Sequence, residues 1–468
     1  MIIKTFYIEM KRLTQIDNVK KILTNTGWLF FDRFFRMGAG FIVGIWLTRY
    51  LGPSQFGVLS YSQSYVSLFS VIASLGLDGI VVRDIVRDPV KKDEILGTAF
   101  VVKLIGGILM ILSVITSLSL FGPDDNYLFI MTTIIASGYV FQCFDTIDFF
   151  FQSKINSKLT VYAKSTAFII CILVKVLLIL EKAPLIYFAI IGGVEIILGS
   201  IGLVVIYKIS KYNISHWNFS IIRAKSLLID SWPLILSGLA VMIYMRIDQI
   251  MLGQMKGSTE VGIYSVAVRL SEVWYFIPTA LTTSIFPLIT ELKQVDERLY
   301  YKRISMTFNI MVIACYSIAV PTMFFSERII VGLFGNQFSE ASIVLTILIW
   351  ASLFVFLGVA KNPWMLNEGL MKYSFYMTIL GAVSNVILNL LLIPKYGAKG
   401  AAIATLLSYF FATIFAMYLY RKTRLIAIMM IQSIFVIPVI RKVFSTGKEW
   451  IRNENKGSYK ETYPQKDS

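Results

Sequence analysis

The sequence predicts an all-α membrane protein with about twelve transmembrane helices in two lobes of six. Three observations lead to this fold class. The 468 residues are 56% hydrophobic and 15% charged, whereas soluble domains carry roughly 25% charged residues. Apolar runs of about twenty residues recur along the chain, each long enough as a helix to cross a hydrocarbon core of roughly 30 Å. Finally, parts of the first half recur in the second half.

Helices are expected rather than a β-barrel, because runs such as 100–120 are apolar on both faces and a barrel strand would alternate. The expected first six helices lie at about 25–48, 56–78, 95–120, 127–151, 158–180 and 184–207. The expected second six lie at about 226–252, 262–289, 304–325, 341–358, 371–393 and 399–420.

The loop charges predict the orientation. With a cytoplasmic N-terminus, the loops on that side carry 24 lysines and arginines, and the opposite side carries only six. Those six are Arg49, Lys182, Lys256, Arg328, Lys395 and Lys399. Such a bias is typical of a protein with both termini in the cytoplasm. We therefore expect a multi-pass protein of the cytoplasmic (inner) membrane.

The chain ends and the linker complete the expected organisation. The run Leu425–Ile440 is basic at both ends and short for a span, so a helix on the cytoplasmic surface is favoured over a thirteenth crossing, which stays open. The expected segments are a cytoplasmic N-terminal segment 1–24, an N-lobe 25–207, an inter-lobe cytoplasmic linker 208–225, a C-lobe 226–420, an interfacial helix 421–447 and a disordered tail 448–468.

Several function classes find little support. The net charge of +16 is spread over loops rather than concentrated in one module, so no nucleic acid partner is expected. Three cysteines inside apolar runs and a single histidine argue against a disulfide framework, a metal site or histidine catalysis. No predicted loop exceeds about twenty residues, too few for a catalytic domain. No catalytic residue, metal ligand or bound cofactor is therefore expected.

An internal repeat relates the two halves. LGPSQFGVLS from Leu51 resembles LGQMKGSTEVGIYS from Leu252, at offsets of 201 to 205 residues. KLTVYAKSTAFIICILVKVLLI from Lys158 aligns with KYSFYMTILGAVSNVILNLLLI from Lys372, at an offset of 214. Halves with an even number of spans have the same topology and are related by an axis along the membrane normal. Two bundles with a cleft between them are expected.

Charged residues inside the predicted spans are the candidate functional residues. An ionised side chain at mid-bilayer costs upwards of about 2.5 kcal/mol, so such residues should face a polar cavity or one another. A structural role stays open for Asp148, Lys164 and Arg269, which can snorkel from a span end, and for Glu272, one turn after Arg269.

The stretch WLFFDRFFRMGAG, residues 28–40, is the hardest to assign a merely structural role. On a helix Asp32, Arg33 and Arg36 lie within an arc of about 100°, so one face carries all three charges. The planar arginine fork suits a phosphate or pyrophosphate, because it gives bidentate hydrogen bonds and keeps its charge. With Lys103 and Lys175 added, the first half favours an anionic substrate and a cationic cleft.

Five stretches together resemble a known family: DRFFR, LTRYLGPSQFGVLSYSQSYVSLF, SLGLDGIVVRDIVRDP, SGLAVMIYMRIDQIMLG and IPKYGAKGAAIAT. The chain resembles, over about residues 20–425, the Wzx-type oligosaccharide flippases. These are also called polysaccharide biosynthesis or O-antigen transporters, and they belong to the superfamily that includes multidrug and toxin extruders.

The resemblance implies a V-shaped, MATE-like bundle of twelve helices. It also implies transport of an undecaprenyl-pyrophosphate-linked sugar unit from the cytoplasmic to the outer leaflet. Functional arginines would be Arg33, Arg36 and Arg49, with Arg246 and Asp248 in the seventh helix. The implied surroundings are the lipid bilayer, a lipid-linked oligosaccharide substrate, and as further partners a polysaccharide polymerase and glycosyltransferases.

The sequence thus gives two sets of candidate residues. Substrate binding is expected at Arg33, Arg36, Arg49, Lys103, Lys175 and Arg246. Coupling to a proton or sodium gradient or to the membrane potential, or simple ion pairing, is expected at Asp32, Asp145, Asp148, Glu195, Asp248 and Glu272. A drug or cation antiporter is the first alternative and would need a predominantly acidic cavity. A multi-pass polymerase or glycosyltransferase is the second and would need a sizeable outer loop.

Overall fold

The computed structural model describes the backbone of residues 2–435 and the side chains of residues 27, 28 and 32–435. Throughout that described backbone the secondary structure is helical, without a strand, which confirms the predicted all-α class. Ten helical segments in it are long and apolar enough to cross a membrane.

Two of these ten segments are much longer than one crossing requires. They run over Asp32–Arg87 and Met371–Leu419, with 56 and 49 residues, whereas about twenty residues span a bilayer. Each contains a glycine with positive φ, Gly52 at 70° and Gly397 at 56°, where the helix is interrupted. A positive φ is strained for residues with a side chain, which explains glycine at both breaks. Dividing both segments there would give twelve crossings, a number that stays a prediction.

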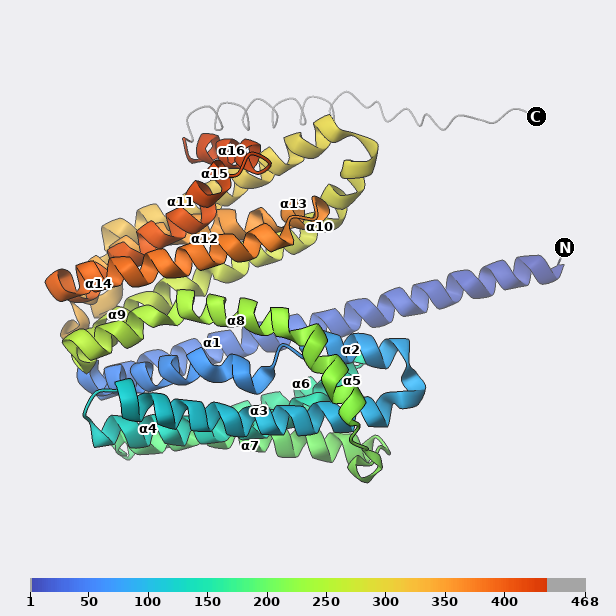
Figure 1. Cartoon of the computed structure of the whole chain (residues 1–468), viewed down its shortest axis with the longest axis horizontal. Coiled ribbons are helices and arrows are strands. Elements are labelled where there is room, and N and C mark those ends of the chain that lie inside the picture. Colours follow the sequence, from blue (N-terminus) through green and yellow to red (C-terminus); the bar gives the residue numbers. More distant parts are fainter. Residues whose placement is uncertain (1, 436–468) are drawn as a thin grey trace. The chain divides into compact units, whose positions relative to one another are not determined.

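The first half of the chain forms seven α-helices (Figure 1). These are α1 (Ile2–Ser74), α2 (Asp78–Arg87), α3 (Lys92–Phe121), α4 (Asn126–Gly138), α5 (Asp145–Ser153), α6 (Ser157–Leu180) and α7 (Leu185–Ile209), with short helices η1 (Pro89–Lys91) and η2 (Tyr139–Phe144). The first helix begins well before the predicted boundary at 25, because no glycine or proline precedes Gly27 to interrupt it. Within this half α6 packs along α7, and α4 also contacts α7.

The second half is also helical. It comprises η3 (Ile214–His216), α8 (Ile221–Lys256), α9 (Ser258–Glu272), η4 (Val273–Tyr275), α10 (Phe276–Val295), α11 (Glu297–Phe334), η5 (Asn336–Phe338), α12 (Ala341–Ala360), α13 (Asn362–Asn367), α14 (Met371–Phe410), η6 (Phe411–Phe415), α15 (Ala416–Leu419) and α16 (Arg424–Ile434). A serine cap begins α8 and a glycine ends it. The Ser220 hydroxyl accepts the Arg223 amide at 3.4 Å, and Gly257, with φ 87°, follows the last turn.

By internal contacts the chain divides into two compact units. Unit 1 comprises Met1–Arg269, Ser326–Leu345 and Ala382–Thr405, and unit 2 comprises Leu270–Phe325, Thr346–Gly381 and Leu406–Ser468. The helices α9, α11, α12 and α14 each contribute to both units. The predicted lobe and linker boundaries stay predictions.

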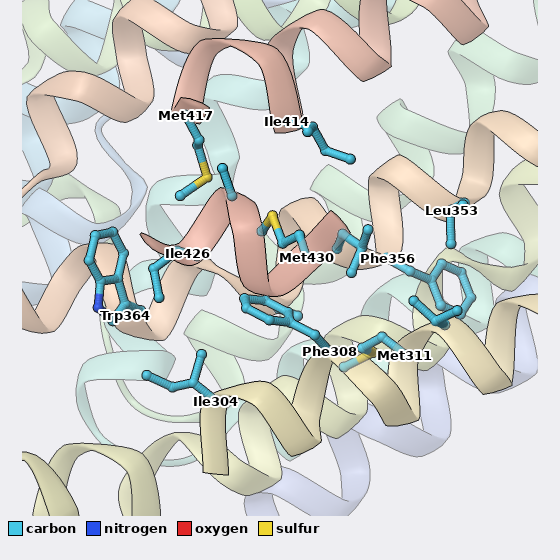
Figure 2. Packing of buried hydrophobic residues seen from close by; sticks show 14 of the residues in the cluster. Ile304, Phe308, Met311, Leu353, Phe356, Trp364, Ile414, Met417, Ile426 and Met430 are labelled. Atoms are coloured by element: carbon cyan, nitrogen blue, oxygen red, sulfur yellow. The ribbon is translucent and has the colours of Figure 1, made fainter. Parts of the chain in front are cut away.

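Unit 2 has a continuous apolar core that includes α16. Ile426 and Met430 of α16 are fully buried and pack in one cluster with Phe308 and Met417 (Figure 2). In the described part of the predicted interfacial helix, one face of α16 therefore packs against the core of unit 2. The remainder of segment 421–447, from residue 436, and the predicted tail 448–468 lie outside the described residues.

Reporter fusions at helix ends test the predicted topology. Because of the charge bias, fusions at Gly122, Ala183 and Gly257 are expected to report the outer side. Fusions at Lys91 and Lys211 should report the cytoplasm. A periplasmic phosphatase and a cytoplasmic fluorescent reporter at each position measure this, and one reversed loop in a stable fusion would contradict the twelve-span topology.

Candidate functional site

The charged stretch of α1 is held against α6 within unit 1. Arg36 Nε donates to Asp32 Oδ1 at 2.9 Å, one helical turn away. The Ser165 hydroxyl of α6 donates to the same carboxylate oxygen. The Arg36 guanidinium also lies over the Phe168 ring, 4.9 Å from its centroid. Both members of the ion pair are thus positioned by α6.

Arg36 retains an unused hydrogen-bond donor. Its Nη2 atom is buried and has no hydrogen-bond partner among the residues whose side chains the structure describes. A buried donor left without an acceptor costs about 1–3 kcal/mol, so native structures rarely keep one without a reason. Arg36 also lines a cavity of about 160 Å³. The other residues that line this cavity are Gln142, Asp145, Lys164, Glu195, Ile196, Gly199, Ser200 and Leu203.

Lys164, which also lines this cavity, lies between two carboxylates. Lys164 Nζ lies 2.9 Å from Asp145 Oδ1 and 2.8 Å from Asp148 Oδ2. Both aspartates occupy the first turn of α5. Both acids were predicted candidates, whereas a structural role stayed open for Lys164. The signal available was the spacing of Asp145 and Asp148, three residues apart and so on one helix face.

Two further ion pairs flank the cavity in unit 1. Lys103, of which only 2% of the side chain is exposed, lies 4.0 Å from Asp78 Oδ1 at the start of α2, with its ammonium 4.8 Å from the Phe149 ring centroid. Lys175 Nζ lies 3.1 Å from Glu195 Oε2. Asp78 was missed because it falls at a predicted span end, in the turn after the second apolar run.

Of the predicted residues, Arg36, Asp145 and Glu195 line the cavity, and the candidates that follow belong neither to its lining nor to the ion pairs described above. Arg33 is exposed on α1. Arg49 is also exposed, and its backbone carbonyl accepts the Gln337 side-chain amide at 2.9 Å. Arg246 on α8 and Glu272 on α9 are half-buried elsewhere. Of the predicted residues, the structure brings together Asp32, Arg36, Lys103, Asp145, Asp148, Lys175 and Glu195.

The positive and negative charges in and beside this cavity are balanced more closely than the predicted cationic cleft requires. Arg36 and the three lysines each face at least one carboxylate within 4.0 Å. An anion entering the cavity would therefore meet cations that are held in place but partly neutralised. Its strongest available partners are the unused Arg36 Nη2 and the ammonium of Lys164.

A second polar site surrounds Asp248 of α8, also in unit 1. The carboxylate is 3% exposed and accepts hydrogen bonds from Tyr264 Oη at 2.8 Å, Thr405 Oγ1 at 2.7 Å and Asn389 Nδ2 at 2.5 Å. None of these three donors carries a charge. Asn389 Nδ2 also donates to Asn385 Oδ1 at 3.1 Å.

The Asp248 site contains an orphaned oxygen. Asn389 Oδ1 is buried and, within the described part of the chain, has no hydrogen-bond partner. A buried carboxylate beside an unused carbonyl oxygen and two hydroxyls matches the oxygen ligands that hard cations prefer, and it also suits a proton. The sequence named Asp248 but none of its partners. Asn385 and Asn389, four residues apart in an apolar run, were the available signal.

Solved structures of the same fold belong to membrane transporters. A multidrug resistance MATE family transporter of the MOP superfamily, in an inward-facing conformation, matches with a TM-score of 0.70 and 14% identity over 84% of this chain and 95% of that chain. The lipid II flippase MurJ, in an inward closed conformation, matches with a TM-score of 0.63 and 16% identity over 90% and 93%. The fold is therefore that of a MATE-like multi-pass helical membrane protein.

The family follows from the sequence comparisons. The family described as polysaccharide biosynthesis protein matches residues 22–293, and the MatE family matches residues 233–391. The chain belongs to the polysaccharide biosynthesis protein family.

Two relatives from Haloferax volcanii are similar over most of the chain. The probable low-salt glycan biosynthesis flippase Agl15 is 26% identical over 81% of this chain and 79% of its own length. The probable flippase AglR is 27% identical over the same shares. The protein is thus a transporter rather than an enzyme.

Proposed function

We propose that this protein is a flippase that moves an undecaprenyl-pyrophosphate-linked oligosaccharide from the cytoplasmic to the outer leaflet, by alternating access, for polysaccharide or O-antigen export. The observation that carries the proposal is the buried, unused Nη2 of Arg36, on a residue that lines the cavity with Lys164. The relatives named as glycan flippases support the same class of substrate.

The pyrophosphate is the part of such a substrate that this cavity suits. The Arg36 fork keeps its charge and offers parallel N–H donors to a phosphate, while Asp32 and Phe168 fix its plane. Lys164 contributes a compact cation that leaves Asp145 and Asp148 when a more highly charged anion arrives. The sugars would move along the polar cleft and the prenyl chain would stay in lipid.

We further propose that the Asp248 site couples transport to a proton or sodium gradient. An ion that neutralises the buried carboxylate removes the cost of an unpaired charge in this apolar environment. The hydrogen bonds to Asp248 join α8 and α9 to α14, so ion binding would change how tightly these helices are held. Ion binding would thus favour one conformation over another.

A drug or cation antiporter is the second candidate function. The balanced charge of the cavity favours it to some degree, because Asp145 and Glu195 line the same space as Lys164. A cationic substrate would bind these carboxylates once the lysine is displaced. The match to the MatE family is consistent with this alternative.

Reconstitution separates the two functions. The purified protein is placed in proteoliposomes that contain a polyprenyl pyrophosphate carrying one fluorescent sugar, and an impermeant quencher reports the leaflet that holds the label. Time-dependent exchange of the label between leaflets, absent from vesicles with Arg36→Ala, is the expected result. Gradient-driven uptake of a cationic dye without lipid exchange would instead establish the antiporter.

In cells, the protein is expected in the cytoplasmic membrane beside glycosyltransferases and a polymerase that supply and consume its substrate.

A further inference from the structure

The two copies of the internal repeat each contain a pair of glycines with the same spacing and backbone shape. In the first copy Gly52 precedes Gly57, and in the second Gly257 precedes Gly262. Gly52 has φ 70° and ψ 174°, and Gly257 has φ 87° and ψ 176°. The first glycine of each pair therefore turns the chain in the same way, and the second lies five residues later in the helix that follows.

The second glycine of each copy packs against the backbone of the other copy. A Cβ atom at Gly57 would overlap the carbonyl oxygen of Ser258, and a Cβ atom at Gly262 would overlap the carbonyl oxygen of Pro53. Pro53 directly follows Gly52, and Ser258 directly follows Gly257. The two contacts are thus reciprocal, as a local two-fold axis relating the repeats would make them. Only glycine permits such close approach of two backbone segments.

The packing continues along the helices away from these turns. Ser64 Oγ of α1 donates to Gln249 Oε1 of α8 at 2.5 Å, and both residues are buried. The ring of Tyr61 lies against Gly253, where a Cβ atom would overlap it. Within unit 1 the two repeats are therefore in contact at several levels, from the turns at Gly52 and Gly257 to the hydrogen bond between Ser64 and Gln249.

We propose that the reciprocal contact of Gly57 and Gly262 is the closure at the outer end of the transport path, and that it parts when the protein opens to that side. The charge bias predicts that the turns at Gly52 and Gly257 lie outside. Backbone contacts of this kind are individually weak, so the closure is tight and still reversible. An added methyl group at Gly57 or Gly262 would hold the two backbone segments apart.

Thiol labelling tests the closure. The reporter is Ser265→Cys in a chain whose three native cysteines are replaced by alanine; Ser265 is buried one turn beyond Gly262, and its hydroxyl has no hydrogen bond to lose. Cells are treated with a membrane-impermeant maleimide. Adding Gly57→Ala or Gly262→Ala is expected to raise the labelling rate at least about tenfold, because the Cβ atom keeps the outer end open.

The matched control is Gly332→Ala, which places a methyl group on a helix where a Cβ atom meets nothing within 4 Å. Its labelling rate should equal that of the parent. The amount and melting temperature of each purified variant show that it folds. Unchanged labelling in both folded glycine variants would overturn the proposal, as would faster labelling in Gly332→Ala. The readout needs no transported substrate, so it is independent of the proposed function.

Discussion

Arg36→Ala is expected to reduce polysaccharide export by at least about 100-fold while the protein remains at its normal level in the membrane. The substitution removes the buried Nη2 and the bidentate fork from the cavity that Lys164 also lines. Arg36→Lys keeps the charge but loses the fork, so an intermediate loss is expected. Export of the surface polysaccharide in a strain that lacks the wild-type protein measures both, and quantitative immunoblotting measures the protein.

A folding defect and a binding defect give different results in one comparison. Removing Arg36 alone takes the ion-pair partner from the Asp32 carboxylate and leaves it the hydrogen bond from the Ser165 hydroxyl. The double variant Asp32→Asn, Arg36→Gln removes both charges and should restore the protein level if the pair matters only for folding, yet leave export absent if Arg36 binds phosphate. Arg33→Ala, an exposed neighbour outside the cavity lining, is the matched control with a smaller expected loss. Normal export from a stable Arg33→Ala, Arg36→Ala protein would contradict the phosphate site.

Apolar length and local spacing account for what could be predicted from the sequence. Asp32 and Arg36 are four residues apart, so their position on one helix face follows from helix geometry alone, and the structure pairs them. The apolar runs predicted the helices well because length and hydropathy decide them locally. The interruptions at Gly52 and Gly397, where the backbone angles are not helical, fall within gaps between predicted spans.

The partners of the charged residues could not be predicted in the same way. Lys164 lies near a span end, and a snorkelling lysine has the same local pattern as one held between two carboxylates. The difference is the position of α5 against α6, which is a tertiary property. Asp248 is joined to Asn389 and Thr405 across more than 140 residues of sequence, so no local pattern relates them. The prediction of a cationic cleft left out the carboxylates that pair with its lysines. Lys103 and its partner Asp78 come from different helices, so their pairing is also a tertiary property.

Asp248→Asn is expected to abolish gradient-driven transport while substrate still binds. The variant keeps the size of the side chain and its ability to accept from Tyr264 and Thr405, but it removes the negative charge that would attract a sodium ion or hold a proton. In proteoliposomes, the dependence of lipid exchange on an imposed sodium gradient at fixed pH, and on a pH gradient without sodium, should both be measured. The parent should respond to one of them, and the variant to neither.

Asn389→Ala separates the two ions. The unused Oδ1 of Asn389 is a ligand for sodium but is not needed by a proton on Asp248, so its loss should raise the sodium concentration for half-maximal exchange about tenfold or more if sodium couples. If a proton couples, the pH dependence should persist, with its midpoint displaced by the lost hydrogen bond from Asn389 Nδ2 to Asp248. The control is Ser352→Ala on α12, which removes a buried hydroxyl that makes no hydrogen bond to any described residue and should change neither response. A fully gradient-dependent Asp248→Asn protein would remove Asp248 as the coupling residue, because no charge would then remain at this site to bind either ion.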